Sequence, residues 1–229
     1  MKKLLLGLSF SLLASSAFAA DAIVEEVAVE VAPVFSWTGG YIGLQGGYAW
    51  GKSQYDILQN DSYSNPDPDG WFGGAYAGYN YQFSNNVVLG IEGDFAFGDV
   101  SGGDIGRFTD GVDPDMTVDA DMNWSGAVRG RFGYAIDRFL PYVSAGIAFA
   151  DYDHSLDHIL GGRVDFSDTY TGWTVGAGVD YALTDNVLLR AEYRYSDFGS
   201  VTYAATPTYF EHEVDLSTND VRFGIAYKF

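Results

Sequence analysis

The sequence predicts an all-β fold: an eight-stranded antiparallel up-and-down transmembrane β-barrel with short periplasmic turns and four long outer loops. Three observations predict it. Bulky apolar side chains alternate with small or polar ones along successive segments, which is the period of a β-strand and not of a helix. Short and long connections between these segments alternate strictly, as they do in membrane barrels. Aromatic side chains gather at both ends of the segments, where such a barrel meets the two membrane interfaces.

The composition fits one exported domain and excludes one class of partner. The chain has 229 residues, 17% of them aromatic, with 29 Gly and no Cys. Its formal net charge is −19. Phosphate binding needs clustered Lys and Arg, so this charge argues against nucleic acid as a partner.

Residues 1–20 have the three parts of a secretory signal peptide. Lys2 and Lys3 precede an apolar run over residues 4–13, and small residues end at Ala19 and Ala20. We expect cleavage after one of these two alanines. The apolar run is too short to span a membrane, although an uncleaved anchoring helix is the alternative.

Residues 21–37 form an acidic segment in which Val and Ala lie between the acidic residues. We interpret it as a periplasmic lead-in, with a short lipid-binding or partner-binding helix as the alternative. The barrel is then expected to occupy residues 38–229, because the strand-like alternation starts at Thr38.

Each of the first four predicted strands has one apolar face and one face of glycine or polar residues. They cover residues 38–50, 71–83, 87–98 and 122–135. Taking the apolar face as outward, the inward polar positions in these strands are, in order, Gln45, Asn80, Glu92 with Asp94, and Arg129 with Arg131.

The last four predicted strands follow the same rule and cover residues 140–152, 172–183, 187–198 and 220–229. Strand 140–152 is mainly apolar. The inward polar residues of the other strands are Asp180 in 172–183, then Arg190, Glu192 and Arg194 in 187–198, and Arg222 and Lys228 in 220–229. About 11 residues at roughly 3.3 Å each, tilted near 40°, rise on the order of 28 Å, close to the hydrocarbon thickness.

The connections set the orientation of the barrel. The tight turns are predicted at residues 84–86, 136–139 and 184–186. The long loops are predicted at residues 51–70, 99–121, 153–171 and 199–219. In outer-membrane barrels the short turns face the periplasm and the long loops face outside.

With this orientation the tryptophans at the outer strand ends form an outer aromatic girdle. Its members are Trp50, Trp71, Trp124 and Trp173. A second girdle at the periplasmic ends contains Trp37, Tyr81, Phe83, Tyr134, Tyr181 and Phe229. The alternative is that aromatic residues simply favour strands.

The inward charges predict an ion-pair network inside the barrel. Its members are Glu92, Asp94, Arg129, Arg131, Asp180, Arg190, Glu192, Arg194, Arg222 and Lys228. Desolvated charges need partners, and the interior of an eight-stranded barrel is only wide enough to be filled by side chains. We therefore expect a lumen plugged by ion pairs, with a cationic lumen that passes small solutes as the alternative.

The final strand ends in an aromatic pattern that resembles the signal by which outer-membrane barrels are recognised for assembly. The matching residues are Phe223, Ile225, Tyr227 and Phe229. This resemblance implies the barrel-assembly machinery and periplasmic chaperones as partners.

No catalytic, metal or cofactor site is predicted. Residues 65–70 partly match a calcium loop, but the twelfth position is Tyr76 and not Glu. His154, His158 and His212 fall in predicted outer loops, and no Cys accompanies them; a metal or haem site formed with His212 or Tyr209 is the alternative. Ser155 adjoins His154, and adjacent side chains rarely make a nucleophile and base pair, so we expect no enzyme.

Several segments resemble a known family. They are GGYIGLQGGYAWG (39–51), NNVVLGIEGDF (85–95), VRGRFGYAIDRFLPYVSAGIAFA (128–150), GWTVGAGVDYALTDNVLLRAEYRYSDFG (172–199) and the final VRFGIAYKF. These segments are similar to the small outer-membrane β-barrel proteins of alphaproteobacteria, the porin-family or outer-membrane-protein β-barrel-domain proteins, which resemble the OmpA transmembrane domain in architecture.

The resemblance implies a location in the cell outer membrane of a Gram-negative bacterium, in contact with lipid and lipopolysaccharide. It implies a role in envelope integrity and as a surface antigen, with no catalytic residues and no cofactor. Two alternatives stay open: porin-like passive diffusion of small solutes, and binding of haem or a host molecule through the outer loops. The oligomeric state is not determined by the sequence.

Overall fold

The structure, a computed structural model, describes residues 35–57, 62–108, 111–158, 162–203 and 211–229. The predicted signal peptide and most of the acidic lead-in lie outside these residues. In the described part of the chain, no helix is long and apolar enough to cross a membrane.

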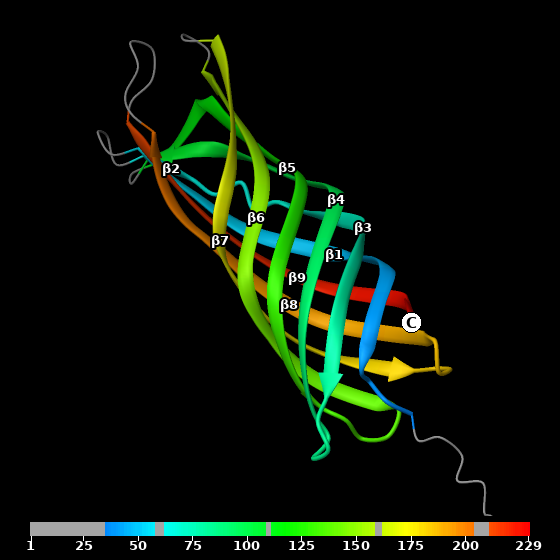
Figure 1. Ribbon diagram of the computed structural model, residues 1–229. Helices are drawn as coiled ribbons and strands as arrows, with labels where there is room; N and C mark the ends of the chain where they lie inside the picture. The colour runs from blue at the N-terminus through cyan, green and yellow to red at the C-terminus, as the bar shows by residue number, and fades with distance from the viewer. Residues whose placement is uncertain (1–34, 58–61, 109–110, 159–161, 204–210) are drawn as a thin grey trace, which may run out of the picture. The chain divides into compact units, whose positions relative to one another are not determined.

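Eight long antiparallel strands form a closed ring (Figure 1). They are β1 (Gly39–Ile57), β3 (Asp69–Gln82), β4 (Val87–Phe108), β5 (Gly111–Tyr134), β6 (Phe139–His158), β7 (Gly162–Ala182), β8 (Val187–Tyr203) and β9 (His212–Lys228). Each strand pairs with its neighbour in sequence, and β1 pairs with β9 to close the ring. A short strand, β2 (Ser62–Ser64), pairs with β1 and β4. The predicted up-and-down barrel is confirmed.

The strands are longer than predicted, and much of each expected outer loop is strand. β4 and β5, for example, continue their pairing to Phe108 and Gly111, through the predicted loop 99–121. The prediction was wrong here because it ended each strand where the bulky apolar side chains stop. The ladder continues beyond that point because backbone hydrogen bonds do not depend on an apolar side chain.

The periplasmic turns are tight, as predicted. Asn86 and Asp137 have positive φ values of 66° and 51°, a conformation that Asn and Asp adopt more readily than other residues with a side chain. The amide of Phe83 donates to the carbonyl of Val87 at 2.8 Å, and Ile136 and Phe139 exchange two backbone hydrogen bonds. These turns fix the register of the strands that they join.

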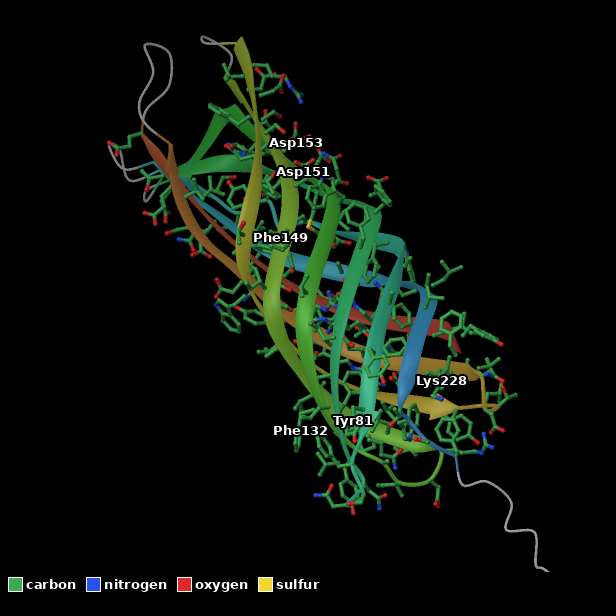
Figure 2. All side chains as sticks on the ribbon, viewed as in Figure 1. Tyr81, Phe132, Phe149, Asp151, Asp153 and Lys228 are labelled. Carbon is green, nitrogen blue, oxygen red and sulfur yellow. The ribbon has the colours of Figure 1, made fainter. Side chains whose placement is uncertain are left out.

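Large apolar side chains form an exposed band around the outside of the barrel. The band includes Ile42, Leu44, Tyr79, Tyr81, Leu89, Ile91, Phe95, Phe97, Val128, Phe132, Val143, Ile147, Val175, Tyr193, Phe223 and Ile225. On β6 it runs from Phe139 to Phe149, a length that rises roughly 25 Å in a tilted strand. Figure 2 shows Asp151 and Asp153 beyond Phe149, on the side of the long connections. The band has the height of a lipid-facing surface.

The interior has an apolar cluster at each end. The periplasmic cluster contains Trp37, Tyr41, Tyr76, Val88, Ala135, Leu140, Ala182, Leu188 and Ala226. The outer cluster contains Ala49, Val100, Val118, Ala120, Met122, Ala127, Ala148, Ala150, Tyr152, Tyr170, Phe198, Val214 and Leu216. Charged residues occupy the space between these two clusters.

Trp37 was predicted to lie in the periplasmic girdle, and the structure corrects this. The side chain is 1% exposed and belongs to the periplasmic cluster. Its amide donates to Oε1 of Gln82 at 2.8 Å, and its indole Nε1 donates to the carbonyl of Asp137 at 3.2 Å. These two hydrogen bonds turn the chain before β1 into the mouth of the barrel, where the ring is buried.

Candidate functional site

The charged residues between the two apolar clusters form the candidate site. Neighbouring strands place opposite charges directly across from each other: Glu92 of β4 is in register with Arg129 of β5, and Glu192 of β8 is in register with Arg222 of β9. Side chains at directly opposed positions lie close enough to interact. The strand register therefore assembles the network from residues that are far apart in sequence.

Arg129 lies at the centre of the network. Its Nη2 lies 2.7 Å from Oε1 of Glu92 and 3.4 Å from Oδ2 of Asp94. Its Nη1 lies 2.5 Å from Oε1 of Glu192 and donates to Oγ of Ser144 at 2.9 Å. The guanidinium connects three carboxylates that come from β4 and β8, across the width of the lumen.

The periplasmic side of the network is built on Asp180. Nη2 of Arg131 lies 2.7 Å from its Oδ2, and Nε of Arg190 lies 2.8 Å from its Oδ1. Nη1 of Arg190 also lies 2.7 Å from Oε2 of Glu92. Arg190 also donates from Nη2 to Oδ2 of Asp180 at 3.2 Å, so it pairs with Asp180 in the fork geometry that suits a guanidinium and a carboxylate.

Two tyrosine hydroxyls complete the hydrogen bonding of the carboxylates. The hydroxyl of Tyr41 donates to Oε2 of Glu92 at 2.7 Å, and that of Tyr142 donates to Oε2 of Glu192 at 2.5 Å. The guanidinium carbon of Arg131 lies 3.8 Å from the ring centroid of Tyr142. A Cβ atom on Gly78 would lie 2.4 Å from the hydroxyl of Tyr41, so glycine makes room for this ring.

The outer side of the network is built on Asp94. Both guanidinium Nη atoms of Arg194 donate to it at 2.9 Å. Nη1 of Arg222 lies 3.3 Å from the same carboxylate, and Arg222 also donates to Asp220 at 2.7 and 2.8 Å. Above this group a cavity of about 30 Å³ adjoins the outer apolar cluster.

The structure brings together every member of the predicted network except Lys228. The ammonium of Lys228 lies 5.5 Å from the ring centroid of Phe35, at the periplasmic mouth (Figure 2). Including Lys228 in the network was wrong. It occupies the last position of β9, so it lies nearer the turns than the layer in which Arg222 and Glu192 pair.

The predicted surface residues lie on the outer face of the barrel. Trp50, Trp71 and Trp173 are exposed there, and Trp124 is half-buried with its ring stacked on Phe95 at a centroid distance of 5.3 Å. The predicted assembly-signal residues are also exposed on this face: Phe223, Ile225, Tyr227 and Phe229. The roles of both sets stay predictions.

Sequence reasoning missed Tyr41, Tyr142, Ser144 and Asp220 as parts of the site. The signal for them was the strand period, because Tyr41 is two residues from the inward Gly43 and Asp220 is two residues from the inward Arg222. Tyr41 and Tyr142 were overlooked because aromatic residues were assigned to the lipid-facing side and to the interfaces.

The histidines do not lie where the sequence placed them. His154 belongs to β6, is 2% exposed, and stacks on Phe166 at a centroid distance of 4.9 Å. His158 is the last residue of β6 and His212 the first of β9. The expectation that His154 lies in a surface loop is wrong, because the strands continue above the apolar band.

A family model described as "Outer membrane protein beta-barrel domain" matches residues 9–229. The 25 kDa outer-membrane immunogenic protein of Brucella abortus is 37% identical over 219 residues, which cover 94% of this chain and 92% of that protein. The 31 kDa outer-membrane immunogenic protein of Brucella melitensis is 38% identical over 247 residues and is covered completely, as is this chain.

Among solved structures, the outer membrane protein OprG of Pseudomonas aeruginosa has the same fold. It matches with a TM-score of 0.55 and 15% identity, covering 86% of this chain and 99% of OprG. At this identity the likeness concerns the fold alone.

Proposed function

Because this chain belongs to the outer-membrane β-barrel domain family and lies in the bacterial outer membrane, we propose that it is a structural barrel and surface antigen with a closed lumen. Its relatives are named as outer-membrane immunogenic proteins, and none of the relatives described above is named as an enzyme. In this proposal the barrel contributes to envelope integrity and presents its outer strands at the cell surface.

The closed lumen is supported by one observation above all, the continuous ion-pair layer between two apolar clusters. Arg129, Glu92 and Glu192 have no exposed side-chain surface. The cavity of about 30 Å³ above them has room for about one or two waters, and so not for a hydrated solute. Opening a path requires buried charges to lose partners, which costs about 3–5 kcal/mol for each broken pair.

Single-channel conductance in planar bilayers tests the closed lumen. The barrel is expected to show no steady conductance, whereas Arg129→Gln combined with Arg194→Gln should produce conducting events by removing two cations that link the strands. Arg163→Gln is the matched control, because Arg163 lies outside the lumen. A large, steady conductance in the unchanged protein would favour passive diffusion of solutes and defeat the proposal.

We also propose the partners that a lipid-facing band requires. The band would contact outer-membrane lipid and lipopolysaccharide, and the aromatic pattern that ends at Phe229 would be read by the assembly machinery. Replacing Phe229 with Ala should slow insertion in a reconstituted assembly assay. If it inserts at the unchanged rate, this residue has no part in recognition.

Binding of haem through His154 is weakened as an alternative, because this imidazole is enclosed in β6 against Phe166. Haemin titration of the folded protein and of His154→Gln checks this point. The spectra of the two proteins should be identical.

A further inference from the structure

The barrel wall splits above the apolar band, between β7 and β8. β7 pairs with β6 from Gly162 to Tyr181, but its register with β8 starts only at Trp173. Within the described ranges, no residue of β8 is in register with residues 162–172 of β7. Figure 1 shows the yellow first half of β7 diverging from the orange strand β8 and the red strand β9.

The split has a local cause. A Cβ atom on Gly172 would lie 2.0 Å from the carbonyl oxygen of Asp197, so the two strands touch closely there. Immediately afterwards β8 is irregular: its pairing with β9 shifts between Asp197 and Ser200, and Gly199 has a φ of 67°. A bulge of this kind bends a strand away from its neighbour.

Among the residues that the structure describes, the first half of β7 is therefore a strand edge. Along such an edge, alternate backbone amides and carbonyls point away from the sheet and can pair with another extended chain. Edges of this kind bind peptides by strand addition, in which backbone hydrogen bonds give affinity and side-chain pockets give specificity.

An acidic hollow lies beside this edge, on the outward face of β5, β6 and β7. It has a volume of about 360 Å³ and its lining includes Asp121, Asp153, Ser155, Asp165 and Ser167. Ser155 is 4% exposed, and among the described residues its Oγ and the Oδ1 of Asp153 have no hydrogen-bond partner. The hollow therefore has unused acceptors as well as negative charge.

Arg163 shows how a cation sits against this hollow. Its Nε donates to Oδ1 of Asp165 at 2.8 Å, and its Nη1 lies 3.8 Å from Oδ2 of Asp119. The side chain is 55% exposed, so the pair is weak and screened by solvent. Arg163 pairs with Asp119 and Asp165 and not with Asp153, whose carboxylate accepts from the neutral amide of Asn123 and forms no ion pair among the described residues.

The charge around the edge selects the occupant. Above the apolar band the strands and their connections contain many Asp and Glu residues, and their basic residues are Lys52, Arg107 and Arg163. A second copy of this chain would bring an equally acidic edge, which like-charge repulsion opposes. The described residues also contain no group of three or more His, Asp or Glu that could hold a metal ion. A cationic chain is the occupant that fits both the edge and the hollow.

We propose that residues 162–171 of β7 bind an extended cationic polypeptide by strand addition. A Lys or Arg side chain of that polypeptide enters the hollow between Asp153 and Asp165. If that side chain lies beside Asp165, the next outward side chain, two residues along the bound strand, lies beside Arg163 or Ser167, since alternate residues share a face. The partner is any basic segment that can be extended over this length. Among such segments, the site prefers those in which basic and apolar residues alternate.

The test uses the protein purified from outer membranes in detergent at 0.15 M salt. The probe is a ten-residue peptide of alternating lysine and valine with blocked ends, titrated by calorimetry. We expect saturable binding of this peptide and no binding of the peptide in which glutamate replaces lysine. If the lysine peptide fails to bind, or the glutamate peptide binds equally well, the proposal is overturned.

Two further arms separate strand addition from simple charge attraction. A lysine-valine peptide methylated at every backbone amide keeps its charge but cannot donate to the edge, and should bind about tenfold or more weakly, because each lost hydrogen bond weakens binding. Binding of the unmethylated peptide should also slow hydrogen exchange of β7 amides between Arg163 and Thr171. Equal binding of the methylated peptide would overturn strand addition.

Variants locate the site. Asp153→Asn with Asp165→Asn should weaken binding by about fivefold or more, because the ammonium loses its carboxylate partners. The matched control is Asp56→Asn with Asp215→Asn, which removes the same charge from the outer part of β1 and β9 and should change binding by less than about twofold. Equal losses in the two variants would contradict a site at β7. A heat-modifiability gel confirms that each variant is folded.

Discussion

At the scale of single residues, burial decides how much the loss of an ion pair destabilises the protein. Arg129 and Arg163 both pair with carboxylates at hydrogen-bonding distance, but Arg129 has no exposed side-chain surface and Arg163 is largely exposed. Water replaces a lost partner at the surface and cannot do so in the lumen. The two arginines therefore make a matched pair for experiment.

Arg129→Gln should destabilise the barrel by about 3–5 kcal/mol, because Glu92, Asp94 and Glu192 keep their charges and lose a shared partner. Arg163→Gln should cost about 0–1 kcal/mol. Urea unfolding of both variants in lipid vesicles measures the difference. Similar values for the two would show that the lumen is hydrated and the layer is not sealed.

Asp121 is a second residue whose surroundings change its properties, in this case its pKa. Partial burial, and then the carboxylates of Asp119, Asp99 and Asp153, raise the pKa of Asp121 above its ordinary value, although Arg163 lowers it. A carboxyl with a raised pKa binds its proton more tightly in the folded state. Its ionisation therefore removes stability as the pH rises from the ordinary value of 3.8 through the folded pKa.

Asp121→Asn should make the outer parts of β5 and β6 less sensitive to pH in this range. Hydrogen exchange of amides near Met122 and Tyr152, followed from pH 4 to pH 7, measures the effect. In the unchanged protein exchange protection, corrected for intrinsic rates, should fall as the pH rises. An equal fall in protection in the variant would mean that other carboxylates cause the pH dependence.

At the scale of the elements, glycine allows the closest approaches between strands. A Cβ atom on Gly146 of β6 would lie 2.0 Å from the carbonyl oxygen of Val128 on β5. On the same pair of strands, a Cβ atom on Gly130 would lie 3.9 Å from the nearest atom, the carbonyl oxygen of Ala145. Backbone cannot move aside as a flexible side chain can, so only the first position requires glycine.

Gly146→Ala should therefore destabilise the barrel by about 1–3 kcal/mol, since the β5–β6 ladder must distort. Gly130→Ala should be close to neutral. Unfolding midpoints of the two variants in the same detergent provide the comparison. A neutral Gly146→Ala would mean that the strand can shift without loss of pairing.

At the scale of the whole molecule, the barrel presents opposite surfaces to lipid and to water. Ala145 lies near the middle of the apolar band on β6, whereas Thr171 lies on the outward face of β7 beyond Trp173. The same substitution should thus have very different costs at these two positions.

Ala145→Arg should destabilise the barrel by about 2–4 kcal/mol, and Thr171→Arg by about 0–1 kcal/mol, because the cost of a charge on the lipid face depends on its depth. Unfolding in lipid vesicles of fixed thickness measures both. Equal costs would place the membrane elsewhere on the barrel.

The amino-acid pattern was enough to predict the eight long strands, their order and which face of each carries charge. These follow from side-chain period and from turn residues such as Asn86 and Asp137, which act over a few neighbouring positions. It also determined that Arg129 and Glu92 face inward, because both belong to the polar face of an alternating segment.

Which side chains lie together across the ring follows from the folded barrel and not from the local pattern. The pairing of Arg194 with Asp94, the burial of Trp37 in the periplasmic mouth, and the enclosure of His154 depend on distant strands. The upward continuation of the strands and the split between β7 and β8 were also decided there. Backbone pairing carries no signature in side-chain polarity, so the sequence alone could not show where the ladder continues or where it parts.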